Sequence, residues 1–416
     1  MSDPRLRQIP LRLTRRALLG GALGAYFLPL STRPTHVDAD TDANAAWSDA
    51  APMPTPHAFH AATLLGDGNL LVTGGRDGQT TLDTATRYDP VADQWTIAAP
   101  MPIPRSQHAA LLLPDGRVFV VGNYQVNVID AIVYDPVADQ WVTVAPLPTP
   151  YGPAGAALLP DGQVLALTCN PQRYDPLTDQ WTATGPLHAS GACTLGNAFT
   201  NLIDGRVLIT GGPYRGGGYN DCALYNPTSN TWMATGLLQA GRAFHTATAL
   251  PDGGALVVGG MDLRGLVTTA ERYDPSRNQW VPAASPHVAR SGHTALLLSD
   301  GSLLVVGGIG AMGDSAPSTT AERYDPTTDT WSDAGVSQPA RTGHAITLLD
   351  TGDVLVTGGV NDPKMPTRAS TFAQRFTTPH TGLGTIRPYR ATNAPSMRTA
   401  AHSDAFSAAA YETSSA

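Results

Sequence analysis

The octamer YDPVADQW occupies residues 88–95, and the same eight letters return at residues 134–141. Four variants of it follow, and each keeps a Tyr and a Trp seven positions apart: YDPLTDQW from Tyr174, YNPTSNTW from Tyr225, YDPSRNQW from Tyr273 and YDPTTDTW from Tyr324. The copies are spaced by roughly 40 to 50 residues, a period that indicates an array of repeated structural units.

One complete unit predicts four short strands. Within residues 60–95, the apolar runs HAATLL and NLLVTGG are separated by a turn around Asp67-Gly68, and the runs TATRY and WTIA are separated by DPVADQ. An Asp-Gly pair between apolar runs is typical of a β-hairpin. Asp-Pro favours a turn because proline restricts φ and the Asp side chain can bond nearby backbone amides.

The unit returns seven times, which predicts the architecture. The Asp-Gly pair stands at the hairpin position of six units, at Asp67, Asp115, Asp161, Asp204, Asp252 and Asp300, and Thr351-Gly352 takes its place in the seventh unit. Paired glycines end the second strand of five units, at Gly74, Gly211, Gly259, Gly307 and Gly358. Paired Gly, then Tyr, then Trp resembles the kelch repeat, over about residues 47–376. The resemblance implies an all-β fold, a seven-bladed kelch-type β-propeller with four antiparallel strands per blade.

The seventh unit predicts how the ring closes. It ends at Phe376 and has no Trp after it, whereas Trp47 precedes the first unit. We therefore expect the N-terminal strand around Trp47 to be the outer strand of the last blade, so that the ring has no unpaired seam. The repeated Tyr and Trp are then packing residues of the blades.

The ends of the chain differ from the repeats. Residues 1–45 contain a basic stretch and then the short apolar run ALLGGALGAYFLPL, which is typical of an export signal, and TRRALLG at residues 14–20 resembles the twin-arginine signal. We expect a periplasmic or extracellular protein with no membrane span after signal removal. The propeller should cover residues 46–376, and the Ala-, Ser- and Thr-rich residues 377–416 should form a disordered or strapping tail.

Charge and cysteine content narrow the possible partners. The formal net charge of the 416 residues is -8, which makes nucleic acid an unfavourable partner. The chain has three cysteines, Cys169, Cys193 and Cys222, which are too few for a disulfide framework. One disulfide between two of them is possible, and the sequence does not assign the pair.

Histidine recurs seven residues before the hairpin turn in five units. The residues are His60, His108, His245, His293 and His344. Equivalent positions on different blades are spread around a ring, whereas metal ligands must converge to about 2 Å from one ion. We therefore expect these histidines to make structural hydrogen bonds, and we expect neither a metal site nor another cofactor.

Arginine recurs three residues before the histidines, and this register predicts a ligand-binding face. Kelch adaptors that capture acidic peptides use Arg here and in the loop after the paired glycines. The resemblance implies a binding set of Arg76, Arg105, Arg242, Arg290 and Arg341. Tyr151 occupies the arginine position of the third unit, and we expect it to pack against the apolar or sugar part of the ligand. The alternative is that the arginines pair with Glu271 and Glu322 and brace the blades.

Two classes of function follow. The first is an exported, monomeric propeller that binds an acidic ligand, a glycan or a protein partner on its loop face. The second is an enzyme resembling the periplasmic kelch sialate epimerase, in which an Arg would hold the sugar carboxylate; no catalytic residue can be assigned. A resemblance to the central domain of galactose oxidase would imply two Tyr, two His and a Cys–Tyr crosslink around copper, together with a further β domain. Only about 40 unpatterned residues follow the repeats, so this option is disfavoured.

Overall fold

The computed structural model describes residues 46–123, 130–148, 155–168, 170–187, 196–212, 218–310, 317–361 and 369–377. The expected export signal, the tail beyond Thr377, Tyr151, Cys169 and Cys193 lie outside these residues. Every regular element in the described part is a strand, and that part contains no apolar helix of membrane-spanning length.

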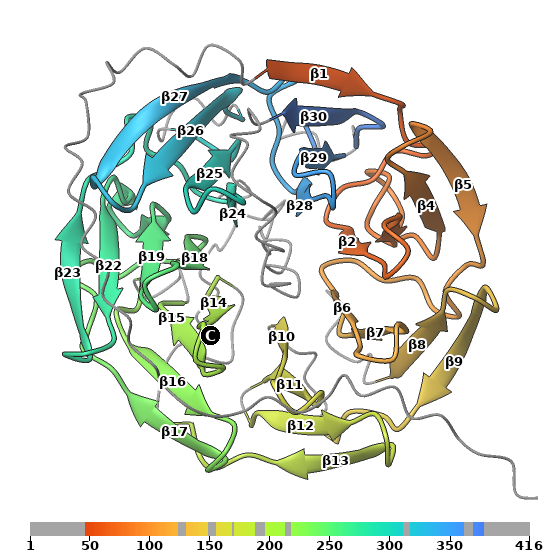
Figure 1. Ribbon diagram of the computed structural model, residues 1–416, viewed down its shortest axis with the longest axis horizontal. Helices are drawn as coiled ribbons and strands as arrows, with labels where there is room; N and C mark the ends of the chain where they lie inside the picture. The colour runs from red at the N-terminus through yellow and green to blue at the C-terminus, as the bar shows by residue number, and fades with distance from the viewer. Residues whose placement is uncertain are drawn as a thin grey trace, which may run out of the picture. The chain divides into compact units, whose positions relative to one another are not determined.

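Seven antiparallel sheets of four strands make up the fold, as the repeat predicts (Figure 1). Blade 1 contains β2 (Ala61–Leu64), β3 (Leu70–Thr73), β4 (Ala85–Asp89) and β5 (Gln94–Ala98). Blade 2 contains β6 (Ala109–Leu112), β7 (Val118–Val121), β8 (Ala131–Asp135) and β9 (Gln140–Val144). Blade 3 contains β10 (Gly155–Leu158), β11 (Val164–Leu167), β12 (Gln172–Asp175) and β13 (Gln180–Ala183). Blade 4 contains β14 (Ala198–Asn201), β15 (Val207–Thr210), β16 (Cys222–Asn226) and β17 (Thr231–Ala234).

The remaining three blades follow the same order. Blade 5 contains β18 (Thr246–Ala249), β19 (Ala255–Val258), β22 (Ala270–Asp274) and β23 (Gln279–Ala283), and the small hairpin β20 (Met261–Asp262) and β21 (Gly265–Leu266) lies in its loop. Blade 6 contains β24 (Thr294–Leu297), β25 (Leu303–Val306), β26 (Thr320–Asp325) and β27 (Thr330–Val336). Blade 7 contains β28 (Ala345–Leu348), β29 (Val354–Thr357), β30 (Ala373–Thr377) and β1 (Ala46–Ala50).

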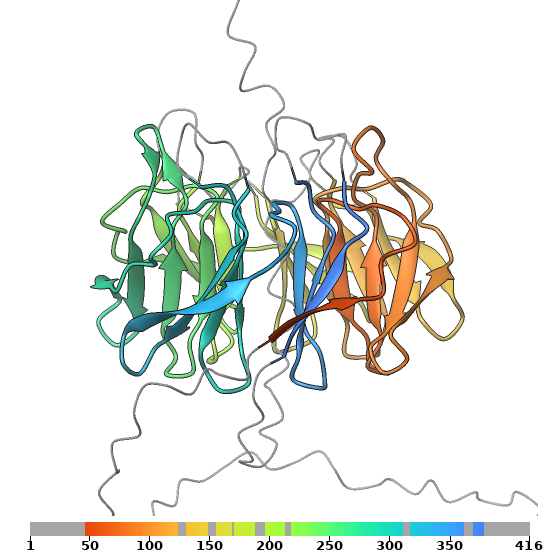
Figure 2. The same cartoon turned by 90° about the horizontal axis from the view of Figure 1, so that it is seen from above.

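The first strand of each blade contacts the first strand of the next, and the series returns from β28 to β2, so the blades form a closed ring (Figures 1 and 2). The second strand of every blade is buried along its whole length, because it is flanked within its own sheet and covered by both neighbouring blades. These strands are continuous runs of Val, Leu, Ile, Ala, Phe and Thr, as two-sided burial requires.

The ring closes through the N-terminal strand, which confirms the sequence-based expectation. Strand β1 pairs antiparallel with β30, and Trp47 lies opposite Phe376. The indole Nε1 of Trp47 donates a hydrogen bond of 2.8 Å to the carbonyl oxygen of Ala334 in blade 6. Trp47 therefore performs in blade 7 the packing role that the octamer Trp performs in the other blades.

The geometry of the octamer explains why its letters repeat. In blade 1 the Tyr88 hydroxyl donates to the Asp93 carboxylate at 2.6 Å, and the backbone N–H of Ala51 donates to the same oxygen at 2.9 Å. Trp95 Nε1 donates to the Ala51 carbonyl at 2.7 Å. Tyr, Asp and Trp thus hold the end of the preceding blade's outer strand, and Asp93 adopts a left-handed φ of 52° to do so.

The paired glycines are required by the contact between blades. Gly74 and Gly75 have φ values of 56° and 96°, and the Gly75 N–H donates to the carbonyl of Arg105 in the next blade at 2.7 Å. A Cβ atom at Gly74 would lie 2.3 Å from that carbonyl and 3.0 Å from His108 Cε1. Any side chain there would separate blade 1 from blade 2.

Candidate ligand-binding face

The four repeated arginines lie where the outer strand of one blade connects to the inner strand of the next. Arg105, Arg242 and Arg290 have no exposed surface, and Arg341 is 1% exposed. Burial of this kind is rare for arginine unless its charge is paired. The partners of each guanidinium group therefore decide what each arginine can do.

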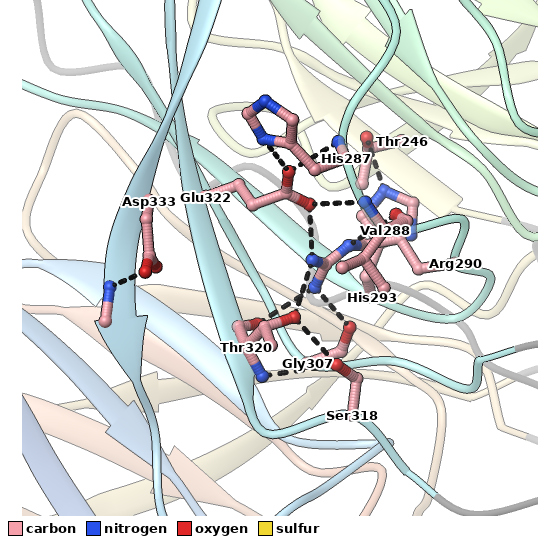
Figure 3. A network of polar contacts seen from close by, with 11 residues as sticks. Thr246, His287, Val288, Arg290, His293, Gly307, Ser318, Thr320, Glu322 and Asp333 are labelled. Carbon is pink, nitrogen blue, oxygen red and sulfur yellow. Dashed lines mark hydrogen bonds and ion pairs between the residues drawn. The ribbon is translucent and has the colours of Figure 1, made fainter.

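Arg290 in blade 6 is bonded through all three of its nitrogen atoms (Figure 3). Its Nη1 donates to the carbonyls of Gly307 and Thr320, both at 2.9 Å, and its Nη2 donates to the Thr320 hydroxyl at 2.9 Å. Nη2 also pairs with the buried carboxylate of Glu322 at 2.6 Å, and Nε donates to the Val288 carbonyl at 3.3 Å. Burial lowers the pKa of the Arg290 guanidinium, and the Glu322 charge opposes that shift.

Both carboxylate oxygens of Glu322 are hydrogen-bonded as well. Its carboxylate accepts the backbone N–H groups of His287 at 2.6 Å and Val288 at 3.3 Å, in addition to Arg290 (Figure 3). It therefore ties the end of blade 5 to the third strand of blade 6.

Blade 5 repeats this arrangement with Arg242 and Glu271, which lie 2.5 Å apart. The brace interpretation is confirmed for these two pairs, and a direct contact of either arginine with a ligand stays a prediction. Glu271 and Glu322 form ion pairs with these arginines, and neither carboxylate is free to transfer a proton. The structure therefore does not favour the sugar epimerase alternative, which needs a free acid or base.

Blade 7 replaces the carboxylate by an amide. Arg341 Nη2 donates to Gln374 Oε1 at 3.1 Å and to the Gln338 carbonyl at 2.7 Å. Gln374 Nε2 in turn donates to the Asp49 carboxylate at 3.1 Å, so the negative charge of this blade lies on the closing strand β1. Burial lowers the pKa of Arg341 to about 10, and Asp49 opposes that shift.

Arg105 in blade 2 differs from the other three. Its Nη1 donates to the Gly122 carbonyl at 3.1 Å, but its buried Nε and Nη2 have no hydrogen-bond acceptor in the described part of the chain. Strand pairing shows why: Ile132 stands opposite Val120, at the place where Glu271 stands opposite Val257 in blade 5. Burial lowers the pKa of Arg105 to about 10, and the charge of Asp130 opposes that shift.

Arg76 lies in the loop of blade 1 that follows the paired glycines, beside the connection that enters blade 1. It follows Gly75, whose N–H is bonded to the Arg105 carbonyl, and its backbone exchanges two hydrogen bonds with Ala58, of 2.8 and 2.9 Å. Its side chain is partly exposed and forms no ion pair with any described residue. The backbone of Gly75 thus links the loop that holds Arg76 to the connection that holds Arg105. Arg242, Arg290 and Arg341 lie at other junctions, and Tyr151 lies outside the described residues.

A comparison between units would have found this difference. The residue two positions before the repeated Tyr or Phe is Thr86, Ile132, Gln172, Ala223, Glu271, Glu322 and Gln374 in blades 1 to 7. Only Glu271 and Glu322 were expected from the sequence to be arginine partners, and the role of this position in the other five blades was missed. The link from Gln374 to Asp49 had no sequence signal, because the two residues are 325 positions apart.

The repeated histidines make the structural hydrogen bonds that the sequence predicts. Each Nε2 shares a hydrogen bond with a threonine hydroxyl of the preceding blade: Thr357 for His60 at 2.9 Å, Thr73 for His108 at 2.8 Å, Thr210 for His245 at 2.7 Å, Thr246 for His293 at 3.1 Å and Thr294 for His344 at 2.7 Å. These bonds link neighbouring blades near the ring axis.

Comparison with known proteins supports the repeat assignment. The kelch motif family matches residues 58–102, 242–287 and 290–335, which belong to blades 1, 5 and 6. These blades carry the kelch motif. No curated protein matches the chain. A solved structure described as a novel fungal alcohol oxidase with catalytic diversity among the AA5 family, in complex with copper, is similar in fold: the TM-score is 0.65 at 17% identity, over 80% of this chain and 76% of that chain. At this identity the similarity concerns the fold alone.

The described residues of the kelch propeller do not fit a copper centre like the one named for that oxidase. Among them, no three His, Cys, Asp or Glu side chains converge on a position that could hold a metal ion. The Nε2 atoms of the five repeated histidines are already bonded to threonine hydroxyls in separate blade junctions.

Proposed function

We propose that this protein is an exported kelch propeller that binds an acidic ligand on its loop face, at the junction of blades 1 and 2. The observation that carries the proposal is the unsatisfied guanidinium of Arg105. The corresponding arginines of blades 5, 6 and 7 donate from every nitrogen, whereas two buried nitrogen atoms of Arg105 have no acceptor among the residues that the structure describes.

An unpaired buried charge costs several kcal/mol, so a partner for Arg105 would be strongly favoured. A ligand carboxylate suits these two nitrogen atoms, because Nε and Nη2 of arginine form the planar fork that bonds both oxygens of a carboxylate. Arg76 adds a second, partly exposed positive charge in the loop directly after Gly75, whose N–H is bonded to the Arg105 carbonyl. Since Arg105 itself is fully buried, binding requires the residues that cover it to move, and we expect slow association.

The experiment compares two matched variants after an array of acidic peptides and acidic glycans has identified a ligand. Arg105→Met should weaken the affinity at least about tenfold, the equivalent of about 1.4 kcal/mol. It should leave the melting temperature unchanged or raise it, because it removes an unpaired buried charge. Arg290→Met should lower the melting temperature, because it leaves the Glu322 carboxylate without its arginine, and should retain the affinity.

The opposite result would be decisive against the site. If Arg105→Met destabilises the fold as Arg290→Met does and binds the ligand as well as the unmodified protein, then Arg105 is a brace and the proposal is wrong.

Export is proposed from residues 1–45 alone and is tested by fusing these residues to a reporter, with Arg15 and Arg16 replaced by Lys as the control.

A further inference from the structure

The outer rim of the ring is formed by the fourth strands, and each of them is the last strand of its sheet. A free strand edge presents unpaired backbone N–H and C=O groups to any other strand that can approach. Proteins usually protect such edges with Lys, Pro, an inward charge or a bulge. This chain has one lysine in all, Lys364, so its rim depends on the other means.

The position two residues after the repeated Trp shows which blades are protected. Blades 5, 6 and 7 carry Pro282, Asp333 and Asp49 at this position. Strand β26 of blade 6 also has a register shift against β27. In blade 1 the same position is Ile97, which is 83% exposed. Strand β5 therefore combines a free edge with an exposed β-branched residue.

A second feature identifies the same side of the ring. The third residue of the turn after the repeated Tyr is aliphatic and almost fully exposed in the first three blades, at Val91 (89%), Val137 (96%) and Leu177 (91%). In blades 4, 5 and 6 the same position holds Thr228, Ser276 and Thr327. Val142 on β9 is also 57% exposed. The turn position thus exposes an aliphatic side chain in blades 1 to 3. Only blade 1 combines it with an exposed, apolar β-branched residue two positions after the Trp.

We propose that this rim binds a second copy of the chain, with β5 of one protomer pairing antiparallel with β5 of its partner about a two-fold axis. A strand paired with itself in this way is self-complementary. With the axis at Thr96, Trp95 of each protomer would lie opposite Ile97 of the other, and pairs of aromatic and β-branched residues stabilise antiparallel strands. The pairing differs from the monomer expected from the sequence.

Charge supports a copy as the occupant. Two chains of net charge -8 repel each other, so a contact between copies must avoid facing carboxylates. Strand β5 has the sequence QWTIA and carries no charge, unlike β1 and β27, which contain Asp49 and Asp333. Pairing of five residues supplies only part of the roughly 800 Å² per partner that a stable interface buries. The exposed Val91 and Val137 lie in the turns that flank β5 and β9 and would supply more apolar area.

The test measures the mass of the full chain in solution by light scattering or sedimentation, over about 1 to 200 µM and at two salt concentrations. We expect a reversible dimer that becomes stronger with salt, because salt screens the repulsion between the acidic copies. Ile97→Asp copies the residue that blades 6 and 7 have at this position. It should raise the dimer dissociation constant at least about tenfold, because each partner would desolvate an unpaired charge. Ala234→Asp, at the same position of blade 4, should leave the dissociation constant unchanged.

A crosslink provides a second readout that does not depend on the strength of the dimer. Thr96→Cys places a thiol at the proposed two-fold axis, where opposite Cα atoms of antiparallel strands lie about 4.5 to 5.5 Å apart, within disulfide range. Oxidation should produce a covalent dimer from Thr96→Cys and not from Ser332→Cys, the same position in blade 6. A single-chain mass at every concentration, or an Ile97→Asp variant of unchanged melting temperature that still dimerises, would overturn the proposal.

Discussion

At the scale of single residues, one position decides how each blade holds its buried arginine. The carboxylates of Glu271 and Glu322 accept a hydrogen bond from their arginine. In blade 7 the side-chain amide of Gln374 accepts from Arg341 and donates to Asp49. Ile132 offers Arg105 no acceptor. The blades therefore share a backbone and differ in chemistry, and the difference is greatest in blade 2.

The same position supports a test of the brace. Glu322→Ala should lower the free energy of unfolding by about 3 to 5 kcal/mol, because it leaves the Arg290 charge buried without its partner. Glu322→Gln should cost clearly less, because the amide oxygen can accept from Arg290 as Gln374 does from Arg341. Urea denaturation measures both values. Equal losses for the two variants would mean that an amide cannot replace the carboxylate and that the negative charge of Glu322 carries the interaction.

At the scale of elements, strand β1 joins the first part of the repeat region to the last. It completes the sheet of blade 7, and the Trp47 ring packs on Phe376 at a centroid distance of 5.1 Å. The indole also bonds to blade 6 through the Ala334 carbonyl. One short strand thus supplies both the sheet pairing and the contact between blades that the octamer supplies elsewhere.

Substitutions on β1 separate these contributions. Trp47→Ala should destabilise the fold by about 3 kcal/mol, as expected for the truncation of a large aromatic residue. Trp47→Phe should cost about 1 kcal/mol, because it keeps a ring against Phe376 and loses the hydrogen bond to Ala334. Ser48→Ala, on the exposed face of the same strand, is the control and should change little. The role of β1 in closure is refuted if Trp47→Ala unfolds at the same urea concentration as the unmodified protein.

At the scale of the whole molecule, the ring is held by histidines that must stay neutral. Desolvation by burial holds the pKa of His60, His245 and His293 well below 6.5 and lowers that of His344 to about 3. The unfolded chain takes up protons on these residues below about pH 6.5, and the folded chain does not. Their contribution to stability is therefore complete above pH 6.5 and is lost progressively as the pH falls toward 3.

Acid should consequently open the ring in a steep transition. Each histidine that stays neutral in the folded state costs about 1.4 kcal/mol of stability for every pH unit below its unfolded pKa. Urea midpoints measured from pH 8 to pH 4.5 should be constant at first and fall sharply below about 6.5. His344→Gln, which can still bond to Thr294 and cannot be protonated, should make the decline shallower. Equal stability at pH 7.5 and pH 4.5 would contradict this account.

Much of the fold could be predicted from the sequence because it depends on neighbours along the chain. Asp-Gly and Asp-Pro turns, apolar runs and the spacing from Tyr88 to Trp95 are local features, and their repetition predicts seven sheets of four strands. Even the closure of the ring was predictable, because the missing Trp after Phe376 and the extra Trp47 complement each other. The period of the sequence alone therefore determined the architecture.

The chemistry of the candidate site was decided by the tertiary structure. An arginine in the connection between blades can point to solvent or into the junction with the same backbone, and the sequence pattern is identical in both cases. Burial, and the partners within reach, decide between them: Glu322 lies 32 positions from Arg290, and Asp49 meets Gln374 across 325 positions. Such contacts exist only in the folded protein, and the contact between Asp49 and Gln374 also requires the closed ring, because closure brings together residues that no local rule connects.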